Sequence, residues 1–295
     1  MEILRTAANP WGENILLGVA WWLIWAALLA GVAFVVVHAV YVGATGGKKG
    51  MTPGPAGAAP VPDKVERHSR SSRTYHWLMA ASMLTLLVTA FFPLVGIQFA
   101  WVTIHWIAGV ALTLLVLWHI YDSFFRQDWR AVWIGGRELG EMKTAVGRFF
   151  SRDKVPHPRM AKYHNDQRMF HHAASITGIG VIITGLLMMF RIDTWFWASN
   201  PYFLSDSTWG LVFVLHGLCG VGLITLVIAH IYFAIRPEKR WMTRSMIKGW
   251  ITREEYLTYY DPDKWLLEGE AKPVAAPSGS GGTDAQGDPE AVAPA

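Results

Sequence analysis

One pattern occurs twice in this chain, as IHWIAGVALTLLVLWHIY at residues 104–121 and as LHGLCGVGLITLVIAHIY at residues 215–232. In each copy a glycine follows the first histidine by four residues, and a second histidine follows it by fourteen. The positions are His105, Gly109 and His119 in the first copy, and His216, Gly220 and His230 in the second. The residues between them are almost all apolar, so both stretches are predicted to be membrane-spanning helices.

The histidine spacing predicts a metal-binding role. Histidine is costly inside a bilayer and is rarely found there without a function. Fourteen helical residues rise about 21 Å, and fourteen steps of about 100° return to within about 40° of the same face. Each helix therefore presents one imidazole near each membrane surface, a geometry that suits two stacked haems, because haem iron takes two axial ligands. Gly109 and Gly220 lack side chains and would let a flat porphyrin approach the backbone.

The composition is typical of a multi-span membrane protein. Of the 295 residues, 52% are hydrophobic, 16 are Trp and only 16% of the chain is charged. The single cysteine, Cys219, excludes iron–sulfur clusters, Cys-type zinc sites and covalently attached c-type haem within this chain. The net charge is +4, but the basic residues flank apolar spans, which favours membrane orientation over nucleic-acid binding.

Five apolar stretches reach the length of about 20 residues that crosses a bilayer, and none has Asp, Glu, Lys or Arg in its interior. They are Ile15–Val42, Tyr75–Phe92, Trp101–Tyr121, Phe170–Phe190 and Leu211–Ile235. The first stretch is too long for a signal peptide and its start is not basic, so it is predicted to be a retained helix. The sequence thus predicts an all-α integral membrane protein, with a four-helix transmembrane di-haem cytochrome b core and one extra N-terminal transmembrane helix.

Composition also predicts where the segments of the chain begin and end. Residues 51–62 are rich in Pro, Gly and Ala, and the chain from about Ala271 is rich in Pro, Gly, Ala and Ser. We expect four segments: an N-terminal transmembrane helix at 1–45, a cytoplasmic linker at 46–70, the four-helix di-haem domain with its cytoplasmic tail at 71–268, and a disordered tail at 269–295.

The distribution of Lys and Arg predicts the orientation in a bacterial inner membrane. Residues 122–169 hold ten Lys and Arg and the tail after the fifth span holds eight, whereas the two opposite connections hold only Arg191. The positive-inside rule then places the N-terminus outside and the C-terminus in the cytoplasm. His105 and His216 would lie near the outer surface, and His76, His119 and His230 near the inner surface.

The pairing of the histidines is settled by these residues only at the outer level, where His105 and His216 are expected to share a haem. At the inner level His76, His119 and His230 compete, and the internal repeat favours His119 with His230. An alternative of a different class is a haem-free anchor or transporter whose histidines form a proton path. The lack of acidic residues in the spans argues against it, because proton relays usually use them.

Several motifs resemble formate dehydrogenase gamma subunits, the cytochrome b subunits of membrane-bound molybdenum or tungsten formate dehydrogenases, whose relatives serve nickel–iron hydrogenases. The resemblance covers roughly residues 65–267. It rests on these motifs: Arg73-Thr-Tyr-His76-Trp77, Ile104-His105 with Gly109, Leu215-His216 with Gly220, His230-Ile-Tyr, and in the tail Met246–Arg253 and Asp261–Trp265. It implies that His76 and His230 hold the inner haem; His119, which the internal repeat favours, is the alternative inner ligand and departs from the family pattern. Arg73 would then pair with a haem propionate or act as a positive-inside anchor.

The resemblance also implies a quinone site and partner subunits. The quinone loop of the family reads approximately Lys-Tyr-Asn-x-Gly-Gln-Lys; here Tyr163 and Gln167 match, whereas His164 and Asp166 depart and are expected to relay protons. Menaquinone or ubiquinone would accept the electrons. An outer iron–sulfur subunit and a molybdenum or tungsten catalytic subunit are expected partners, since this chain has no substrate-oxidising centre. A hydrogenase or another molybdopterin oxidoreductase is the alternative complex.

Overall fold

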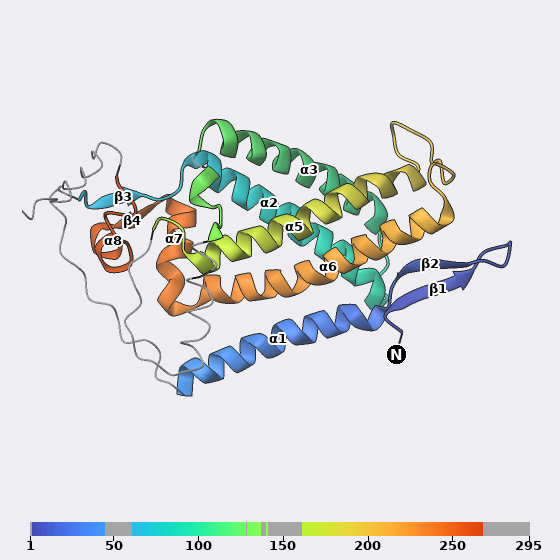
Figure 1. The fold of residues 1–295 in the computed structure, drawn as a ribbon, viewed down its shortest axis with the longest axis horizontal. Coiled ribbons are helices and arrows are strands. Elements are labelled where there is room, and N and C mark those ends of the chain that lie inside the picture. The colour runs from blue at the N-terminus through green and yellow to red at the C-terminus, as the bar shows by residue number, and fades with distance from the viewer. Residues whose placement is uncertain (1, 45–60, 128, 137–139, 141–160, 268–295) are drawn as a thin grey trace, which may run out of the picture.

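A computed structural model describes residues 2–44, 61–127, 129–136, 140 and 161–267. Five long helices run along one axis, and a small cap of helices and strands covers one end of them (Figure 1). In the described part of the chain, five helices are long and apolar enough to cross a membrane. The prediction of five spans in an all-α membrane fold is therefore confirmed. The predicted linker at 51–62 and the tail from Ala271 lie almost wholly outside the described residues.

The long helices are α1 (Trp21–Ala44), α2 (Arg70–Phe91), α3 (Trp101–Phe125), α5 (Asn165–Met188) and α6 (Asp206–Ile235). Short 3-10 turns extend α2 and α5, at Phe92–Val95 and Met189–Arg191. Serine caps begin two of the helices: the Ser69 hydroxyl accepts the Ser72 N–H at 3.2 Å, and the Ser205 hydroxyl accepts the Thr208 N–H at 3.3 Å. Such caps satisfy backbone donors that the first helical turn leaves free.

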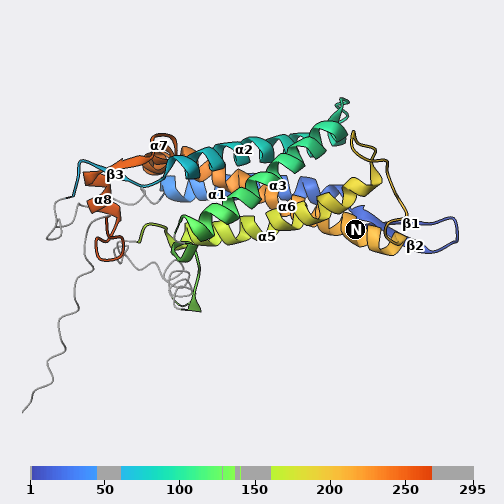
Figure 2. The ribbon, with the colours of Figure 1, turned by 90° about the horizontal axis from the view of Figure 1, so that it is seen from above.

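The N-terminus forms a β-hairpin that the sequence did not predict. Strand β1 (Leu4–Ala8) pairs antiparallel with β2 (Asn14–Val19), and Figure 2 shows this hairpin and the cap at opposite ends of the bundle. The predicted first span, which begins at Ile15, is therefore wrong at its start, since the helix begins at Trp21. The apolar residues run from β2 into α1 without interruption, and hydropathy alone does not separate an apolar strand from a helix.

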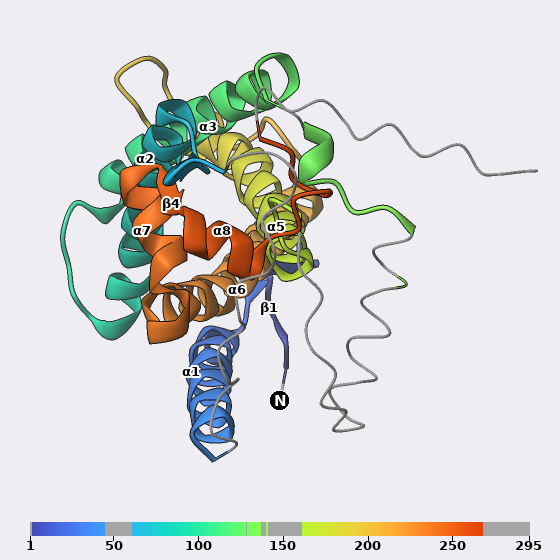
Figure 3. The same cartoon turned by 90° about the vertical axis from the view of Figure 1, so that its left-hand side faces the viewer.

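Helix α1 lies outside the ring formed by the other four helices and packs against α6 (Figure 3). Gly31 lies directly against Ile228: a Cβ atom at Gly31 would come within 2.9 Å of the Ile228 Cδ1 atom. Toward the cap end, the His38 Nδ1 atom lies 3.0 Å from the Tyr232 hydroxyl. Helix α1 therefore depends on close backbone approach at one level and on a polar contact at another.

The cap joins segments that are far apart in sequence. Strand β3 (Lys64–Glu66) pairs antiparallel with β4 (Trp250–Thr252), and the helices α7 (Arg240–Lys248) and α8 (Arg253–Tyr259) flank them. Its buried apolar core consists of Val61, Val65, Trp241, Ile251, Tyr256, Leu257, Tyr260 and Trp265. The C-terminal part of the segment predicted as a linker, 46–70, is folded, because Val61 and β3 belong to this core.

We predict that Gly31→Leu destabilises the packing of α1 on α6. The added side chain meets Ile228 in a filled interface, and overpacking of this kind costs about 1–3 kcal/mol. Gly43→Leu is the matched control, since a Cβ atom at Gly43 on the same helix meets nothing within 4 Å. Thermal unfolding of the purified protein in detergent measures both. Equal melting temperatures for the two variants would contradict the close approach at Gly31.

Candidate functional site

Two histidines face each other between α3 and α6 at the hairpin end of the bundle. The ring centroids of His105 and His216 lie 6.3 Å apart, with the ring planes at 66°. A bound metal ion lies about 2 Å from each imidazole nitrogen, and each nitrogen lies about 1 Å from its ring centre. Two imidazoles on one ion should therefore have ring centroids roughly 6 Å apart. The spacing therefore fits one metal ion held between the two imidazoles.

Threonines from the neighbouring helices hold both of these rings. The Thr89 hydroxyl lies 2.8 Å from the His105 Nδ1 atom and donates its proton to the Thr85 carbonyl at 2.8 Å. The Thr184 hydroxyl lies 2.9 Å from the His216 Nδ1 atom and donates to the Gly180 carbonyl at 2.6 Å. Because each hydroxyl proton is used, the threonine oxygen accepts the Nδ1 proton. This fixes the neutral tautomer with a free Nε2 lone pair, which is the form that binds metal.

A second pair lies at the cap end. The ring centroids of His76 on α2 and His230 on α6 lie 6.2 Å apart, with the planes at 48°. The Phe170 ring stacks on His230 at 4.8 Å and 21°. These are the two residues that the motif resemblance pairs, and the structure brings them together.

His119 lies elsewhere at the same end of the bundle. Its ring stacks on Tyr75 at 4.1 Å and 8°, and its centroid lies 6.2 Å from that of His171. In the described part of the chain, the rings of His119 and His230 do not contact each other. The pairing that the internal repeat favours is thus not the one the structure shows, because α3 faces α5 here while α6 faces α2.

The other residues predicted to contact haem are two glycines, which leave space beside their helices, and Arg73, which bonds to the cap. Gly220 has nothing within 4 Å of a Cβ position, and at Gly109 only a Leu86 side-chain atom comes as close as 3.9 Å, so both positions leave room beside the helix. The Arg73 Nη1 atom donates to the Ile247 carbonyl at 2.6 Å. Arg73 therefore ties α2 to the end of α7, and its pairing with a haem propionate and its role as a positive-inside anchor both stay predictions.

The predicted quinone residues lie at the start of α5, where Tyr163, His164 and Gln167 are half-buried and Asp166 is exposed. The Gln167 Oε1 atom accepts a long hydrogen bond of 3.4 Å from the Arg67 Nη2 atom, and the Tyr163 ring contacts the His68 ring at 6.4 Å between centroids. His164 instead contacts Asp166, with 2.8 Å between its Nδ1 and the Asp166 Oδ1 atom. The Asp166 side chain is 61% exposed, whereas His164 is half-buried, so this contact leads from the surface to a partly buried imidazole.

Sequence reasoning missed Arg67 and His68, which appear in the sequence only as part of a basic flank. Arg67 is 3% exposed; its Nη1 atom donates to the Ser245 hydroxyl at 2.9 Å, and its guanidinium lies 5.5 Å from the Trp241 ring centre. His68 is 7% exposed, and burial, followed by the Arg67 charge, lowers its pKa to about 2. Burial likewise raises the pKa of Tyr163, and raises that of Tyr260 to about 12. The cluster beside Gln167 therefore holds a neutral histidine and two protonated phenols.

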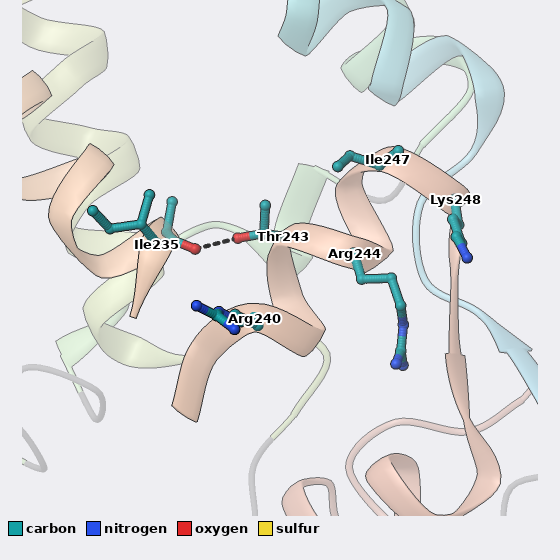
Figure 4. A pocket seen from close by; sticks show the side chains of 7 residues that line it. Ile235, Arg240, Thr243, Arg244, Ile247 and Lys248 are labelled. Carbon is teal, nitrogen blue, oxygen red and sulfur yellow. Dashed lines mark hydrogen bonds between the residues drawn. The ribbon is translucent and has the colours of Figure 1, made fainter. Parts of the chain in front are cut away.

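A separate cavity lies where α6 meets α7 (Figure 4). Its volume is about 470 Å³, and the Thr243 hydroxyl closes one side by donating to the Ala234 carbonyl at 2.6 Å. The basic residues of its lining repeat every four positions on one face of α7, and they are Arg240, Arg244 and Lys248. None of the histidines lines this cavity, so it is distinct from the metal-binding geometry of the bundle.

Imidazoles that face each other in pairs inside a membrane bundle are the arrangement that axial ligation of haem iron requires. The chain belongs to the prokaryotic cytochrome b561 family, whose sequence model matches residues 67–249. Family membership means a multi-pass prokaryotic membrane protein that binds haem b and carries electrons within a redox complex. A search of curated proteins finds no match to the chain.

We predict that Thr89→Val and Thr184→Val weaken haem binding at the hairpin end without removing the histidines. Each variant loses the acceptor for an Nδ1 proton, and the loss of such a supporting contact typically costs 10–100-fold in metal affinity, roughly. Thr85→Val is the control, because its hydroxyl donates to the Ala81 carbonyl of its own helix. Redox titration and haem retention during purification measure the effect. Identical potentials in all three variants would contradict the role of the threonines.

We predict that acid destabilises the cap through His68. Its pKa is about 2 in the folded protein against an ordinary value of 6.5, so below pH 6.5 only the unfolded chain takes up the proton. Stability is complete above about pH 6.5 and falls as the pH drops toward the folded value, by at most about 1.4 kcal/mol per pH unit. Melting temperatures from pH 7 to 5 should fall less steeply in His68→Leu. Parallel curves for both proteins would contradict this.

Proposed function

We propose that this chain is the membrane-anchoring di-haem cytochrome b subunit of a formate dehydrogenase-like respiratory complex. The observation that carries the proposal is the pair of facing imidazoles at each end of the bundle, with centroid separations of 6.3 and 6.2 Å. Helix α6 contributes to both pairs through His216 and His230, whose fourteen-residue spacing corresponds to about 21 Å along the helix. Two haem sites joined by one helix suit electron transfer across a membrane.

In this proposal His105 and His216 hold the outer haem b, and His76 and His230 hold the inner one. When bound, haem b supplies a one-electron iron couple whose potential depends on its ligands and surroundings. The chain supplies neutral imidazoles in fixed orientations, with Thr89 and Thr184 setting the outer pair. The stacked ring of Phe170 restricts the orientation of His230 and excludes water from one of its faces.

The proposed orientation puts the N-terminus outside and the C-terminus in the cytoplasm. Basic residues gather in the cap and at the cap ends of the helices, as the positive-inside rule requires of the cytoplasmic side. Electrons would enter from an outer iron–sulfur subunit and leave at the cap end. The oxidation of formate would belong to a molybdenum or tungsten subunit; in the described parts of this chain no group of three or more His, Cys, Asp or Glu could hold a metal.

The quinone, menaquinone or ubiquinone, would bind at the start of α5. Gln167 and Tyr163 offer a hydrogen-bonding amide and a protonated phenol beside the buried Arg67. The exposed Asp166 carboxylate lies 2.8 Å from the Nδ1 atom of the half-buried His164 and 3.9 Å from the Lys239 Nζ atom. This pair would take up protons from the cytoplasm for quinone reduction, while Gln167 and Tyr163 orient the head group.

A hydrogenase complex is the second candidate. The matched family covers cytochrome b subunits of nickel-dependent hydrogenases, and the same chain chemistry would serve that complex or another molybdopterin oxidoreductase. Purification of the native complex separates these candidates, because formate or hydrogen would reduce the haems according to the catalytic subunit present. Reduction by hydrogen but not by formate would contradict the formate dehydrogenase proposal.

We predict that the ligand variants fall into two pairs. His105→Ala and His216→Ala should each abolish the same haem, and His76→Ala and His230→Ala should each abolish the other, because an iron that loses one axial imidazole binds far more weakly. Reduced-minus-oxidised spectra with haem quantified per chain measure this. His38→Ala is the control, since its imidazole bonds to Tyr232 between α1 and α6. Loss of different haems by His76→Ala and His230→Ala would contradict the inner assignment.

We predict that Gln167→Leu raises the KM for a soluble quinone analogue. A hydrogen bond to the head group is worth about 1–3 kcal/mol, or roughly 5- to 160-fold. Gln127→Leu is the control, because Gln127 bonds to Ser72 and Asp122 at the end of α3. Stopped-flow reoxidation of the reduced haems measures the KM. A KM equal to that of the unmodified protein in Gln167→Leu would place the quinone elsewhere.

A further inference from the structure

The cavity where α6 meets α7 has an apolar side and a basic side (Figure 4). Ile235, the last residue of the membrane-spanning helix α6, and Ile247 of α7 form the apolar side, and they are 64% and 55% exposed. Arg240, Arg244 and Lys248 form the basic side, one on each successive turn of α7. No Asp or Glu is among the described residues that line the cavity. A ligand that fits both sides must therefore combine an anionic group with an apolar part.

Two of the three cations lack an acidic partner. The Arg244 Nη2 atom donates to the Glu255 carboxylate, which compensates the charge of this arginine. In the described part of the chain, Arg240 and Lys248 form no ion pair. The Lys248 ammonium lies 5.9 Å from the Trp250 ring centre, a contact that leaves its charge uncompensated. Because both of these side chains are exposed, they can reach an anionic ligand.

The cavity lies where the chain leaves the helix bundle. Helix α6 ends at Ile235, the turn Pro237–Lys239 changes the direction of the chain, and α7 then lies across the end of the bundle (Figure 3). Basic residues on one face of a helix at the membrane surface are typical of contacts with anionic lipid head groups. In this position the exposed Ile235 side chain meets acyl chains, while the cations of α7 lie at the level of the head groups.

The spacing of the three cations suits a phosphate group. Residues four positions apart on a helix are separated by about 6 Å along its axis. Arg240 and Arg244 can therefore reach one phosphate together, and so can Arg244 and Lys248. A soluble anion such as inorganic phosphate would meet these cations but leave Ile235 and Ile247 in water. A phospholipid would place its phosphate on the basic side and its acyl chains on the apolar side, which removes that apolar surface from water.

We propose that this cavity binds an anionic phospholipid from the membrane leaflet at the cap end of the bundle. The phosphate lies against Arg240, Arg244 and Lys248, and the acyl chains lie against Ile235 and Ile247. In the orientation proposed above, this is the cytoplasmic leaflet. The inference goes beyond the proposed function, because it does not depend on which catalytic subunit or which quinone the chain serves.

A lipid held at this place is expected to fix α7 against α2. Trp77 on α2 donates its Nε1 proton to the Met246 carbonyl at 3.3 Å, beside the bond of 2.6 Å from Arg73 to the Ile247 carbonyl. These bonds connect the proposed lipid-binding helix to the start of the helix that carries His76. Since a ligand of the folded state stabilises that state, bound lipid should raise the melting temperature of the protein.

Native mass spectrometry of the full-length protein in detergent tests the proposal. Dioleoyl phosphatidylglycerol, which is anionic, and dioleoyl phosphatidylcholine, which is zwitterionic, are titrated separately. The unmodified protein should bind the first lipid saturably and more tightly than the second. Each basic residue near an anionic lipid surface contributes roughly fivefold in affinity. Arg240→Gln and Lys248→Gln should therefore each weaken phosphatidylglycerol binding about fivefold, and the double variant roughly 25-fold.

The matched control removes two cations elsewhere on the cap. Lys64→Gln combined with Arg253→Gln lowers the net charge equally, and neither of these exposed residues lines the cavity, so binding should be unchanged. Arg240→Lys combined with Lys248→Arg keeps both charges and should retain binding, which separates a loss of charge from misfolding. The haem content per chain should be the same in all of these proteins.

Three results would overturn the lipid site. The first is equal affinity for the two lipids, and the second is an equal loss of binding in the two double variants that each lose two charges. The third is displacement of bound phosphatidylglycerol by equimolar inorganic phosphate, which would identify a site for a soluble anion. None of these results concerns the haem ligands, so the lipid site can fail while the proposed function stands.

Discussion

The structure depends on the cost of leaving an imidazole nitrogen without a partner inside the bilayer. A membrane interior offers no water to bond a free nitrogen, so each histidine must find its partner in the protein or in a bound group. At the hairpin end, Thr89 and Thr184 bond one nitrogen of His105 and His216 and leave the other pointing toward its counterpart. The four-helix ring, the glycines that leave room within it and the facing pairs all follow from that requirement.

The remaining elements support this ring from outside it. Helix α1 packs along α6, the helix that carries one histidine of each pair, with Gly31 against Ile228. The cap fixes the other end: Arg73 bonds to the Ile247 carbonyl, and Arg67 links Ser245 to Gln167 at the start of α5. The cap thus connects α2, α5 and α7 beside the pair His76 and His230, and a change in the cap is expected to be felt at that pair.

The sequence predicts the spans and the outer pair well, because hydropathy marks a helix that meets lipid and a fourteen-residue spacing marks one helix face. It fails where contacts are non-local or hydropathy is ambiguous. The β1–β2 hairpin merges with the apolar start of α1, and β3 pairs with β4 although the whole four-helix bundle lies between them in the sequence. Arg67 and His68 look like any basic flank. The contact between His119 and His171 was not predicted from the sequence either.

The central claim is that facing histidines, and no other residues, ligate the haem irons. Near-infrared magnetic circular dichroism of the oxidised protein tests this most directly, because the charge-transfer band of low-spin ferric haem depends on the identity of its two axial ligands. The geometry of the facing pairs predicts bis-histidine ligation for every haem in the sample. A band for histidine–methionine ligation, or a high-spin haem with one open position, would contradict it.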